Sequence, residues 1–349
     1  MRSARLGVFV ATVALACDRK PTPAAEPPPP VPPAPTASPA APLDADARTA
    51  ARRLFGTPPR PGRVVGTIEA ATNGDPQINS SGVLATSGAG GKVYTVYATP
   101  DGIRVGGPID LGSVRLLATD GARVCASDKS ALRCANVDGS GTAQRSTGTS
   151  VTTGLWGGSN VLLRATVTGA ETGIEASEDG FLTARRVGLL KRRAVVAAFV
   201  ESSTHWTTVL LPTEGTIKPR YGLTVDGGQT AIADFGALDR TGWSVGDRLW
   251  PDQLVTGAFS TETVVAERGE KQTTVTLPWS TVGGFAFAKH SLLLFGRGSS
   301  GSGGFLLVEF PSRHVTTFTP PSSHPFIAAG LVGGAIVAIN NEGQVLAWE

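Results

Sequence analysis

Two stretches decide the fold class: residues 118–138, which read ATDGARVCASDKSALRCANVD, and residues 333–348, which read GGAIVAINNEGQVLAW. Each contains a short apolar run, a polar turn and a second short run, with a small residue before the first run. This order is typical of an antiparallel hairpin, because the turn residues reverse the chain between two strands. The two stretches therefore predict strands at two places that are far apart in the chain.

The rest of residues 62–349 continues this pattern. The region has no long stretch with the 3.6-residue period of a helix, and short β-rich runs recur between clusters of Gly, Asp, Ser and Thr. We therefore predict an all-β domain of 288 residues. The clearest runs are 93–97, 161–167, 194–200, 207–211, 263–267, 273–277, 291–295, 305–310, 315–318 and 335–339.

A weak repeat suggests the architecture. Asp-Gly pairs recur at residues 101–102, 138–139, 179–180 and 226–227, in steps of 37, 41 and 47 residues. Asp-Gly is a strong turn signal, because both residues tolerate positive φ. A four-stranded propeller blade takes about 40 residues, so the domain has the length of about seven blades. We predict a seven-bladed β-propeller; six or eight blades also fit the length, and a pair of β-sandwiches is the alternative.

The two hairpin stretches also resemble known propeller repeats. The run VCAS followed by a turn and LRC resembles repeats of the regulator-of-chromosome-condensation type, and a turn followed by VLAW resembles quinoprotein-type repeats. Both resemblances imply the central hairpin of a blade. The His that the first family carries before its first strand is missing, as is the Trp-Asp signature of WD repeats. We therefore expect propeller architecture without assigning a repeat family.

Residues 1–17 have the organisation of a bacterial export signal. Arg2 and Arg5 precede an apolar run of 11 residues at 6–16, which is too short to span a bilayer because a spanning helix takes roughly 20 residues. The sequence Ala14-Leu15-Ala16-Cys17 resembles a lipobox, although Ala14 stands where that family prefers Leu. The resemblance implies removal of residues 1–16 and acylation of Cys17. An ordinary cleaved signal with a chance Cys, or a simple membrane anchor, is the alternative.

A tether is predicted to follow Cys17. Eleven of the 25 prolines lie between Pro21 and Pro42, in a segment with almost no apolar side chain to bury. We expect such a segment to be disordered and to favour extended polyproline II, which would reach roughly 80 Å at full extension. A semi-rigid spacer of this kind would hold a folded domain away from a membrane. The alternative is a docking site for proline-recognising modules.

One short helix is expected between the tether and the domain, at residues 44–55 (DADARTAARRLF). Asp44 or Asp46 would cap it, Arg52 and Arg53 suit the dipole at its C-terminal end, and Gly56 would end it. We interpret it as a solvated helix end or a fraying linker. Residues 17–61 are accordingly assigned to the lipidated cysteine, the linker and this helix, and residues 62–349 to the propeller.

The charge balance excludes one class of partner. The chain has 31 basic and 28 acidic residues, and loss of the leader removes two arginines and no acid, which leaves a balance of +1. A protein that binds nucleic acid needs a larger excess of positive charge. We therefore expect no nucleic-acid partner.

The other two cysteines are predicted to form a disulfide. Cys125 and Cys134 flank eight residues and lie in the two short runs of one hairpin. An exported chain meets an oxidising compartment, so antiparallel strands that bring these residues opposite each other would join them. A metal site or a catalytic thiol is less favoured, because neighbouring His ligands are missing.

No catalytic, cofactor or metal residues are predicted. The histidines at 205, 290, 314 and 324 lie far from one another, without metal-ligand spacing. Residues 88–93 superficially resemble a phosphate loop but lack its first Gly and its hydroxyl residue, and we interpret them as a hairpin turn. Residues 136–141 have the look of a partial calcium loop, and the shortage of carboxylates again favours a turn. Residues 296–304 read as a loop between two strands.

Two further sets of side chains are candidates for a binding surface. Residues 185, 186 and 191–193 form the only dense basic patch, which we interpret as a solvated segment between blades; lipid head groups or an acidic glycan are the alternative ligands. The six tryptophans are spread at intervals, as expected for packing between blades, and a sugar-stacking cleft is the alternative.

These features predict a lipid-anchored, extracytoplasmic propeller that acts as a non-catalytic binding or scaffold module of the bacterial cell envelope. It would face the periplasm or the cell surface, bind the membrane through its lipid, and recognise a protein or glycan through loops at one end of the ring. The alternative function is an enzyme acting on envelope polysaccharide, with carboxylates from different blades in the central channel.

Overall fold

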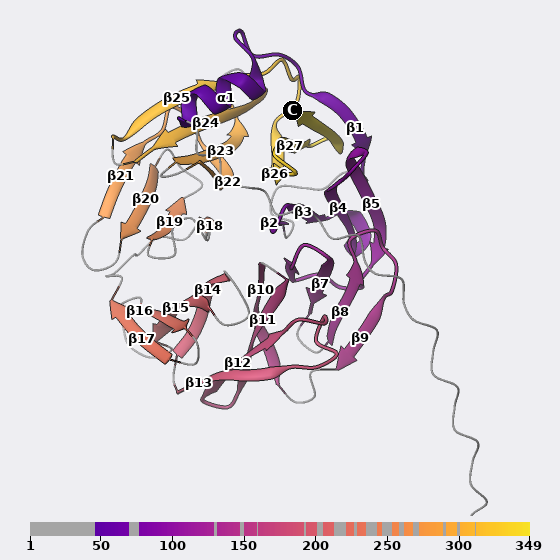
Figure 1. Ribbon diagram of the computed structural model, residues 1–349, viewed down its shortest axis with the longest axis vertical. Helices are drawn as coiled ribbons and strands as arrows, with labels where there is room; N and C mark the ends of the chain where they lie inside the picture. The colour runs from indigo at the N-terminus through magenta and orange to yellow at the C-terminus, as the bar shows by residue number, and fades with distance from the viewer. Residues whose placement is uncertain are drawn as a thin grey trace, which may run out of the picture. The chain divides into compact units, whose positions relative to one another are not determined.

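The computed structural model describes residues 46–69, 77–128, 131–146, 150–158, 160–191, 193–200, 205–212, 221–226, 229–234, 243–245, 253–257, 262–267, 272–288, 291–298, 301–310 and 312–349 (Figure 1). The chain divides into two compact units, residues 1–33 and 34–349, and every described residue lies in the second. The leader, Cys17 and the proline-rich tether therefore lie outside the described residues. Within the described part, no helix has the length and apolar character that crossing a membrane requires.

The described strands form seven antiparallel sheets of four strands each. This confirms the all-β prediction, and four-stranded sheets are what propeller blades contain. The first three sheets are β2 (Gln77–Ser80), β3 (Val83–Ser87), β4 (Lys92–Thr99) and β5 (Gly102–Asp110); β6 (Leu116–Thr119), β7 (Arg123–Ser127), β8 (Ala131–Asn136) and β9 (Ala143–Ser146); and β10 (Val151–Gly158), β11 (Val161–Thr168), β12 (Glu171–Ser177) and β13 (Arg185–Lys191).

The remaining four sheets follow in chain order, except that the last recruits the first strand of the chain. They are β14 (Arg193–Val200), β15 (His205–Pro212), β16 (Tyr221–Asp226) and β17 (Gln229–Asp234); β18 (Trp243–Val245), β19 (Gln253–Gly257), β20 (Glu262–Glu267) and β21 (Gln272–Thr276); β22 (Thr281–Ala288), β23 (Ser291–Arg297), β24 (Gly303–Glu309) and β25 (His314–Phe318); and β26 (Phe326–Val332), β27 (Ala335–Asn340), β28 (Gln344–Trp348) and β1 (Arg63–Thr67).

The hairpin and strand predictions hold. The two stretches that decide the fold class form β7–β8 and β27–β28, which are the second and third strands of their sheets and so are central hairpins. Each of the ten predicted runs overlaps a strand, with ends that shift by at most two residues.

The Asp-Gly repeat marks an equivalent position in four successive sheets. Each of the four pairs lies where the third strand of a sheet turns into the fourth: between β4 and β5, β8 and β9, β12 and β13, and β16 and β17. Gly102, Gly139 and Gly180 all have positive φ, as the turn requires. A further Asp-Gly pair at residues 120–121 lies between β6 and β7, outside the repeat.

The last sheet joins the two ends of the β region. Strand β1 pairs antiparallel with β28, with Arg63 opposite Ala347 and Thr67 opposite Gln344. First strands of successive sheets contact one another at β2–β6, β6–β10, β10–β14, β18–β22 and β22–β26, and β26 returns to contact β2 and β3. Neighbouring sheets are therefore in contact at these junctions, and the last sheet, which β1 completes, also contacts the first.

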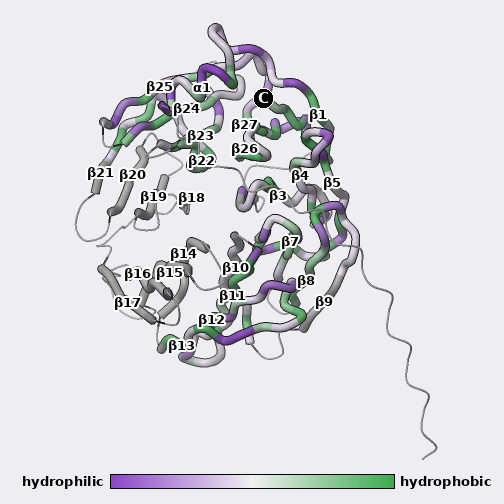
Figure 2. Tube along the Cα trace, in the orientation of Figure 1, coloured by the Kyte–Doolittle hydropathy of each residue, from purple (hydrophilic) through white to green (hydrophobic). Residues whose placement is uncertain are grey.

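The hydrophobic core lies mostly in the seams between neighbouring sheets. Leu84 and Tyr94 of the first sheet pack with Ile327 and Val337 of the last. A second cluster of buried apolar residues joins the first sheet to the second, and a third such cluster joins the second sheet to the third. Figure 2 shows the corresponding hydrophobic stretches along strands such as β11, β22 and β26. Each sheet therefore buries its apolar residues against its neighbours.

Polar contacts also cross the seams. The side-chain amide of Asn79 on β2 accepts a hydrogen bond from the Leu331 N–H of β26 at 3.2 Å and donates to the Leu331 carbonyl at 3.3 Å. A Cβ at the neighbouring Gly330 would overlap the Asn79 side chain. The first and last sheets are therefore joined by a two-point clamp that requires Gly at position 330.

The short helix predicted before the β region exists, but its interpretation as solvated or fraying is wrong. Helix α1 (Ala47–Phe55) begins after Asp46, whose carboxylate accepts from the Thr49 N–H at 3.3 Å, and it ends at Gly56 with φ 88°. Five of its nine residues are buried, at the i, i+3, i+4, i+7, i+8 spacing of one helix face: Ala47, Ala50, Ala51, Leu54 and Phe55.

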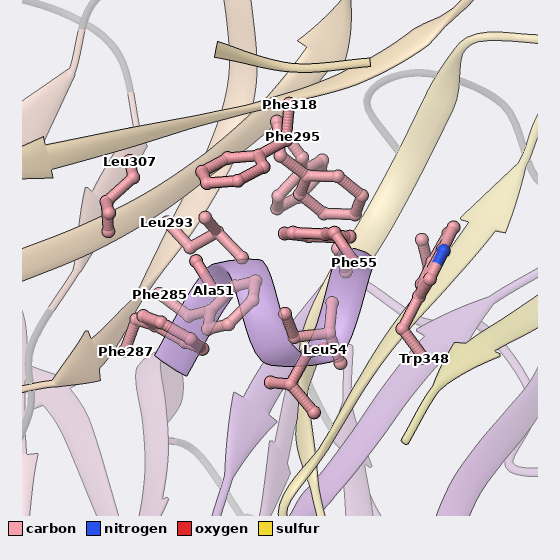
Figure 3. Packing of buried hydrophobic residues seen from close by; sticks show 14 of the residues in the cluster. Ala51, Leu54, Phe55, Phe285, Phe287, Leu293, Phe295, Leu307, Phe318 and Trp348 are labelled. Carbon is pink, nitrogen blue, oxygen red and sulfur yellow. The ribbon is translucent and has the colours of Figure 1, made fainter. Parts of the chain in front are cut away.

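This face of α1 packs on aromatic residues from the end of the chain (Figure 3). The ring of Phe55 lies 5.0 Å from those of Phe305 and Phe318 and 5.6 Å from that of Trp348. At the start of the helix, the Arg48 guanidinium contacts the Glu309 carboxylate at 2.7 Å. The helix is therefore an integral part of the core at the last two sheets.

Candidate functional site

The predicted cysteine pair lies at the centre of the second sheet. Cys125 on β7 is directly opposite Cys134 on β8, and the two sulfur atoms are 2.01 Å apart, at bonding distance. Both side chains are buried. The arrangement has the pairing that the hairpin predicted.

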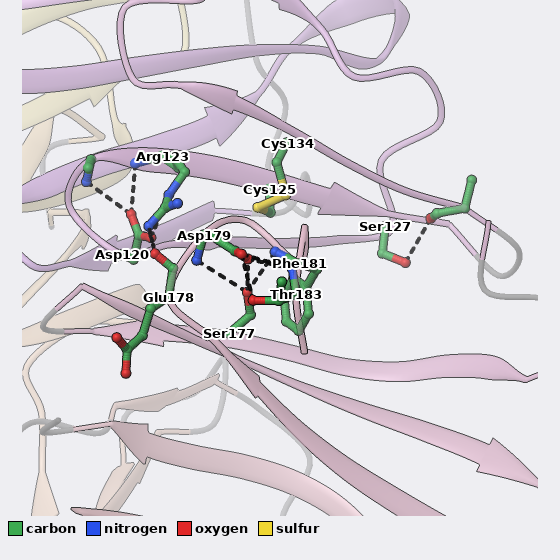
Figure 4. The surroundings of a disulfide bond; sticks show 12 residues. Asp120, Arg123, Cys125, Ser127, Cys134, Ser177, Glu178, Asp179, Phe181 and Thr183 are labelled. Carbon is green, nitrogen blue, oxygen red and sulfur yellow. Dashed lines mark hydrogen bonds and ion pairs between the residues drawn. A yellow bond between two sulfur atoms is a disulfide. The ribbon is translucent and has the colours of Figure 1, made fainter. Parts of the chain in front are cut away.

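A turn of the next sheet covers this pair (Figure 4). Residues 178–184 connect β12 to β13, and the buried ring of Phe181 packs in the same cluster as both cysteines. A Cβ at Gly180 would lie 3.7 Å from the Cys134 sulfur, so the turn backbone passes directly over the disulfide. The disulfide therefore forms part of the seam between the second and third sheets.

Hydrogen bonds fix the shape of this turn. The Ser177 hydroxyl accepts from the Phe181 N–H at 2.7 Å, and the Asp179 carboxylate accepts from the Thr183 N–H at 2.8 Å and the Thr183 hydroxyl at 2.6 Å. Burial by itself would raise the pKa of Asp179, but the hydrogen bonds from Thr183 and Ser177, with the nearby charge of Arg123, outweigh it and hold the pKa below its ordinary value.

An ion pair with a buried carboxylate holds the turn from the other side of the seam. The Asp120 carboxylate is fully buried and accepts from the Arg123 backbone N–H at 2.7 Å and from its Nε at 2.9 Å. The Arg123 guanidinium also donates to the carbonyl of Glu178, in the turn. Neither Asp120 nor Arg123 was predicted from the sequence; the Asp-Gly pair at 120–121 is the sequence signal that marks this turn.

The turn and β13 present apolar and basic side chains to solvent. Leu182 is 55% exposed and Leu189 is 50% exposed, and they are two of the four exposed large apolar residues in the described part of the chain. Arg185 and Arg186 between them are also exposed. The predicted basic patch thus begins on a strand, while Arg192 lies outside the described residues. The structure describes no side chain for Lys191 or Arg193.

The described histidines and carboxylates do not gather into a metal site. No group of three or more His, Cys, Asp or Glu that could hold a metal occurs among the described residues. His314 begins β25, and His324 lies before β26, where its Nε2 is 3.1 Å from Glu342. His290 lies outside the described residues, as does the side chain of His205.

The glycine-rich turns have the structural roles that were predicted. Residues 88–91 connect β3 to β4 through a short 3₁₀ turn at Ala89–Gly91, and residues 92–93 begin β4. In the calcium-like segment, the Asp138 carboxylate accepts from the Ser140 N–H and hydroxyl at 2.9 and 2.7 Å, and Asn136 donates to the same hydroxyl at 2.9 Å. These bonds close the turn on itself.

The described tryptophan side chains favour core packing. Trp279 and Trp348 are buried in two different clusters, and Trp156 packs partly buried against the core of the third sheet. The side chains of Trp206 and Trp243, and Trp250 as a whole, lie outside the described residues.

Comparison with known proteins gives a likeness at the level of structure. No family model and no curated protein matches the sequence. The chain is similar to the WD40 β-propeller domain of Doa1, at 10% identity and a TM-score of 0.51 over 83% of this chain and 96% of that chain. It is also similar to the β-propeller domain of the Trilobed protease from Pyrococcus furiosus, at 9% identity and a TM-score of 0.50 over 82% and 96% of the two chains.

That second domain is described as having an open velcro topology, whereas β1 pairs with β28 here. At such low identity the likeness concerns the fold alone. Together with the four-stranded sheets, it shows that residues of this chain adopt a β-propeller fold.

Proposed function

We propose that this chain is a lipid-anchored, extracytoplasmic binding or scaffold module of the cell envelope, in which each of the seven sheets is one blade. The observation that carries the proposal is the β-propeller fold, with four-stranded sheets and a closing β1–β28 pair. A closed set of sheets holds its turns in fixed relative positions, which suits recognition by surface loops and edges. The export signal and Cys17 supply the proposed location.

The proposed anchor places the binding module off the membrane. Acylated Cys17 would insert in the bilayer, and the tether of about 26 residues would span up to roughly 80 Å before α1 begins. Because α1 packs beside the C-terminal strands, the tether would join the module at its closing sheet. One acyl-modified residue would thus fix the compartment, and the tether would fix the point at which the module is attached.

The anchor is tested by membrane fractionation of cells expressing Cys17→Ala or treated with globomycin. We expect the variant to leave the membrane fraction, and Cys134→Ala, which keeps the lipobox, to stay in it. Unchanged membrane retention of Cys17→Ala would reject the lipid anchor. Crosslinked capture of envelope components by the mature chain then tests the binding role, and turnover of envelope polysaccharide by the pure protein would instead favour an enzyme.

The proposal includes oxidation of the Cys125–Cys134 pair in the exported chain. Peptide mass mapping without reductant should find the two residues linked, because export places the facing thiols in an oxidising compartment. Two free thiols in freshly isolated envelope protein would contradict it.

A further inference from the structure

Strand β13 is an edge strand of the third sheet. It pairs with β12 on one side, and no other described strand pairs with its other side. Alternate backbone N–H and C=O groups of an edge strand point away from its sheet, and they can pair with an added strand. The strand has seven residues, without proline, which is long enough for such pairing.

One apolar side chain on β13 is left uncovered by its own sheet. Val187 and Leu190 pack, partly buried, against the core of the third sheet. Leu189 is 50% exposed, and its cross-strand neighbour is Gly173, which has no side chain to cover it. Leu182, in the preceding turn, is 55% exposed. The edge therefore offers apolar contacts as well as backbone groups.

The same segment concentrates positive charge. Residues 180–200 contain five basic residues and no acidic one, in a chain whose overall balance is only +3. Arg186 lies opposite Glu175, but that carboxylate already accepts from Nε of Arg164 at 3.0 Å. An incoming ligand therefore meets a predominantly basic strand.

We infer that β13 accepts an extended acidic segment of a partner protein as an added strand. The backbone edge would supply hydrogen bonds, Leu189 and Leu182 would supply apolar contact, and the arginines would select acidic side chains. A second copy of β13 would not suit this edge, because like charges would face each other. The proline-rich tether would not suit it either, because proline has no N–H to donate. The inference rests on the proposed binding function.

A bilayer is a different kind of occupant for the same residues. Anionic lipid would attract the arginines, but its hydrocarbon would leave the strand's backbone groups without hydrogen-bond partners. Basic residues on an edge strand also discourage pairing between copies of a protein. The exposed Leu189 and the absence of acidic residues from segment 180–200 favour an acidic peptide over a bilayer and over a second copy of the chain. The following experiment distinguishes these occupants.

The experiment measures binding of a fluorescein-labelled ten-residue peptide of alternating Glu and Val to the full chain carrying Cys17→Ala. We expect binding that weakens with salt and that weakens about tenfold in Leu189→Asp and in the double variant Arg185→Glu/Arg186→Glu. Matched controls on other edge strands are Val64→Asp on β1 and Arg104→Glu on β5, both exposed in the native chain, and these should bind as the parent does. Circular dichroism confirms that each variant is folded.

A second readout reports on the backbone. Amide hydrogen exchange across β13 should slow when the peptide is bound, because an added strand protects the outward N–H groups. Comparison probes are the same peptide with Lys in place of Glu, and phosphatidylcholine vesicles containing phosphatidylglycerol. No binding at millimolar peptide, equal binding of the Lys peptide, indifference to the β13 variants, or binding to vesicles alone would each overturn the inference. The β13 variants also separate this inference from the proposed binding function. If Leu189→Asp and Arg185→Glu/Arg186→Glu still capture envelope components as the parent does, the binding function stands and only the edge-strand site is rejected.

Discussion

Asn79 shows how one side chain can close a large β structure. Its side-chain amide accepts a hydrogen bond from the Leu331 N–H and donates one to the Leu331 carbonyl. A residue of a neighbouring strand would form the same two bonds through its backbone, whereas Asn79 forms them through its side chain, between two sheets. A third bond, from Nδ2 to the Val83 carbonyl at 3.2 Å, holds the amide in place. The neighbouring Gly330 leaves the space that this arrangement needs.

Gly330→Ala should therefore destabilise the protein. The added Cβ would overlap an amide that three hydrogen bonds fix, and we expect the free energy of unfolding to fall by about 1–3 kcal/mol. Urea denaturation measures the change. Gly298→Ala is the control, because its Cβ would lie 3.5 Å from the Ser302 carbonyl, an ordinary contact. Equal effects of the two substitutions would contradict the clamp.

Asp179 gives the turn over the disulfide a dependence on pH. Its pKa is lower in the folded state than its ordinary value of 3.8, so its ionised form stabilises the fold. That stability is present above about pH 4 and is lost as the pH falls through the lower folded pKa. The difference in unfolding free energy between the parent chain and Asp179→Asn should be largest at neutral pH and should shrink below about pH 4. A difference that stays constant from pH 7 to pH 3 would argue against this role of the carboxylate.

At the scale of the element, helix α1 changes what the N-terminal region is. Its five buried residues occupy one face, and they share a cluster with aromatic rings from β22, β23, β24, β25, β26 and β28. Its exposed Arg52 and Arg53 lie in the last turn, where positive charge is favourable to the helix dipole. The helix therefore belongs to the folded module, and the linker ends before it.

Phe55→Ala tests this role. Loss of a fully buried ring that contacts three other aromatic rings should lower the free energy of unfolding by about 3–5 kcal/mol. Arg53→Ala, on the exposed face of the same helix, should change it by less than about 0.5 kcal/mol. Chemical denaturation compares them, and similar midpoints would mean that α1 does not contribute to the core.

At the scale of the molecule, closure depends on strand β1. It completes the last sheet, and three contacts strengthen the junction: Arg63 with the Glu349 side chain at 2.6 Å, Arg60 with the Glu349 carbonyl at 2.6 Å, and the Trp348 indole N–H with the Arg60 carbonyl at 3.0 Å. The N-terminal and C-terminal segments of the β region are thus held in one sheet.

Removal of residues 46–67 should leave β28 as an open edge. We expect the shortened chain to self-associate with rising concentration, because an unpaired strand edge is a template for other chains. Size-exclusion chromatography over a concentration series measures this. Removal of residues 18–43 is the control. This shortened chain should have the same oligomeric state as the parent chain at every concentration. If both deletions behave alike, β1 is not needed for closure.

The sequence by itself determined ten of the strands as short β-rich runs, two of the central hairpins and the positions of the repeated turns. These features are local: a turn needs Gly at positive φ within a few residues, and a strand needs a short apolar run beside it. The pairing of Cys125 with Cys134 was predictable for the same reason, since both lie in one hairpin.

Only the tertiary structure decided which surfaces those elements bury. Phe55 meets Trp348 and Asn79 meets Leu331 across more than 250 residues of sequence, and Phe181 covers a disulfide that belongs to another sheet. The exposure of Leu189 likewise depends on Gly173 lying opposite it. A local pattern shows that a residue is apolar, but its burial depends on which distant segment the fold brings beside it, and that partner is chosen by the packing of whole sheets.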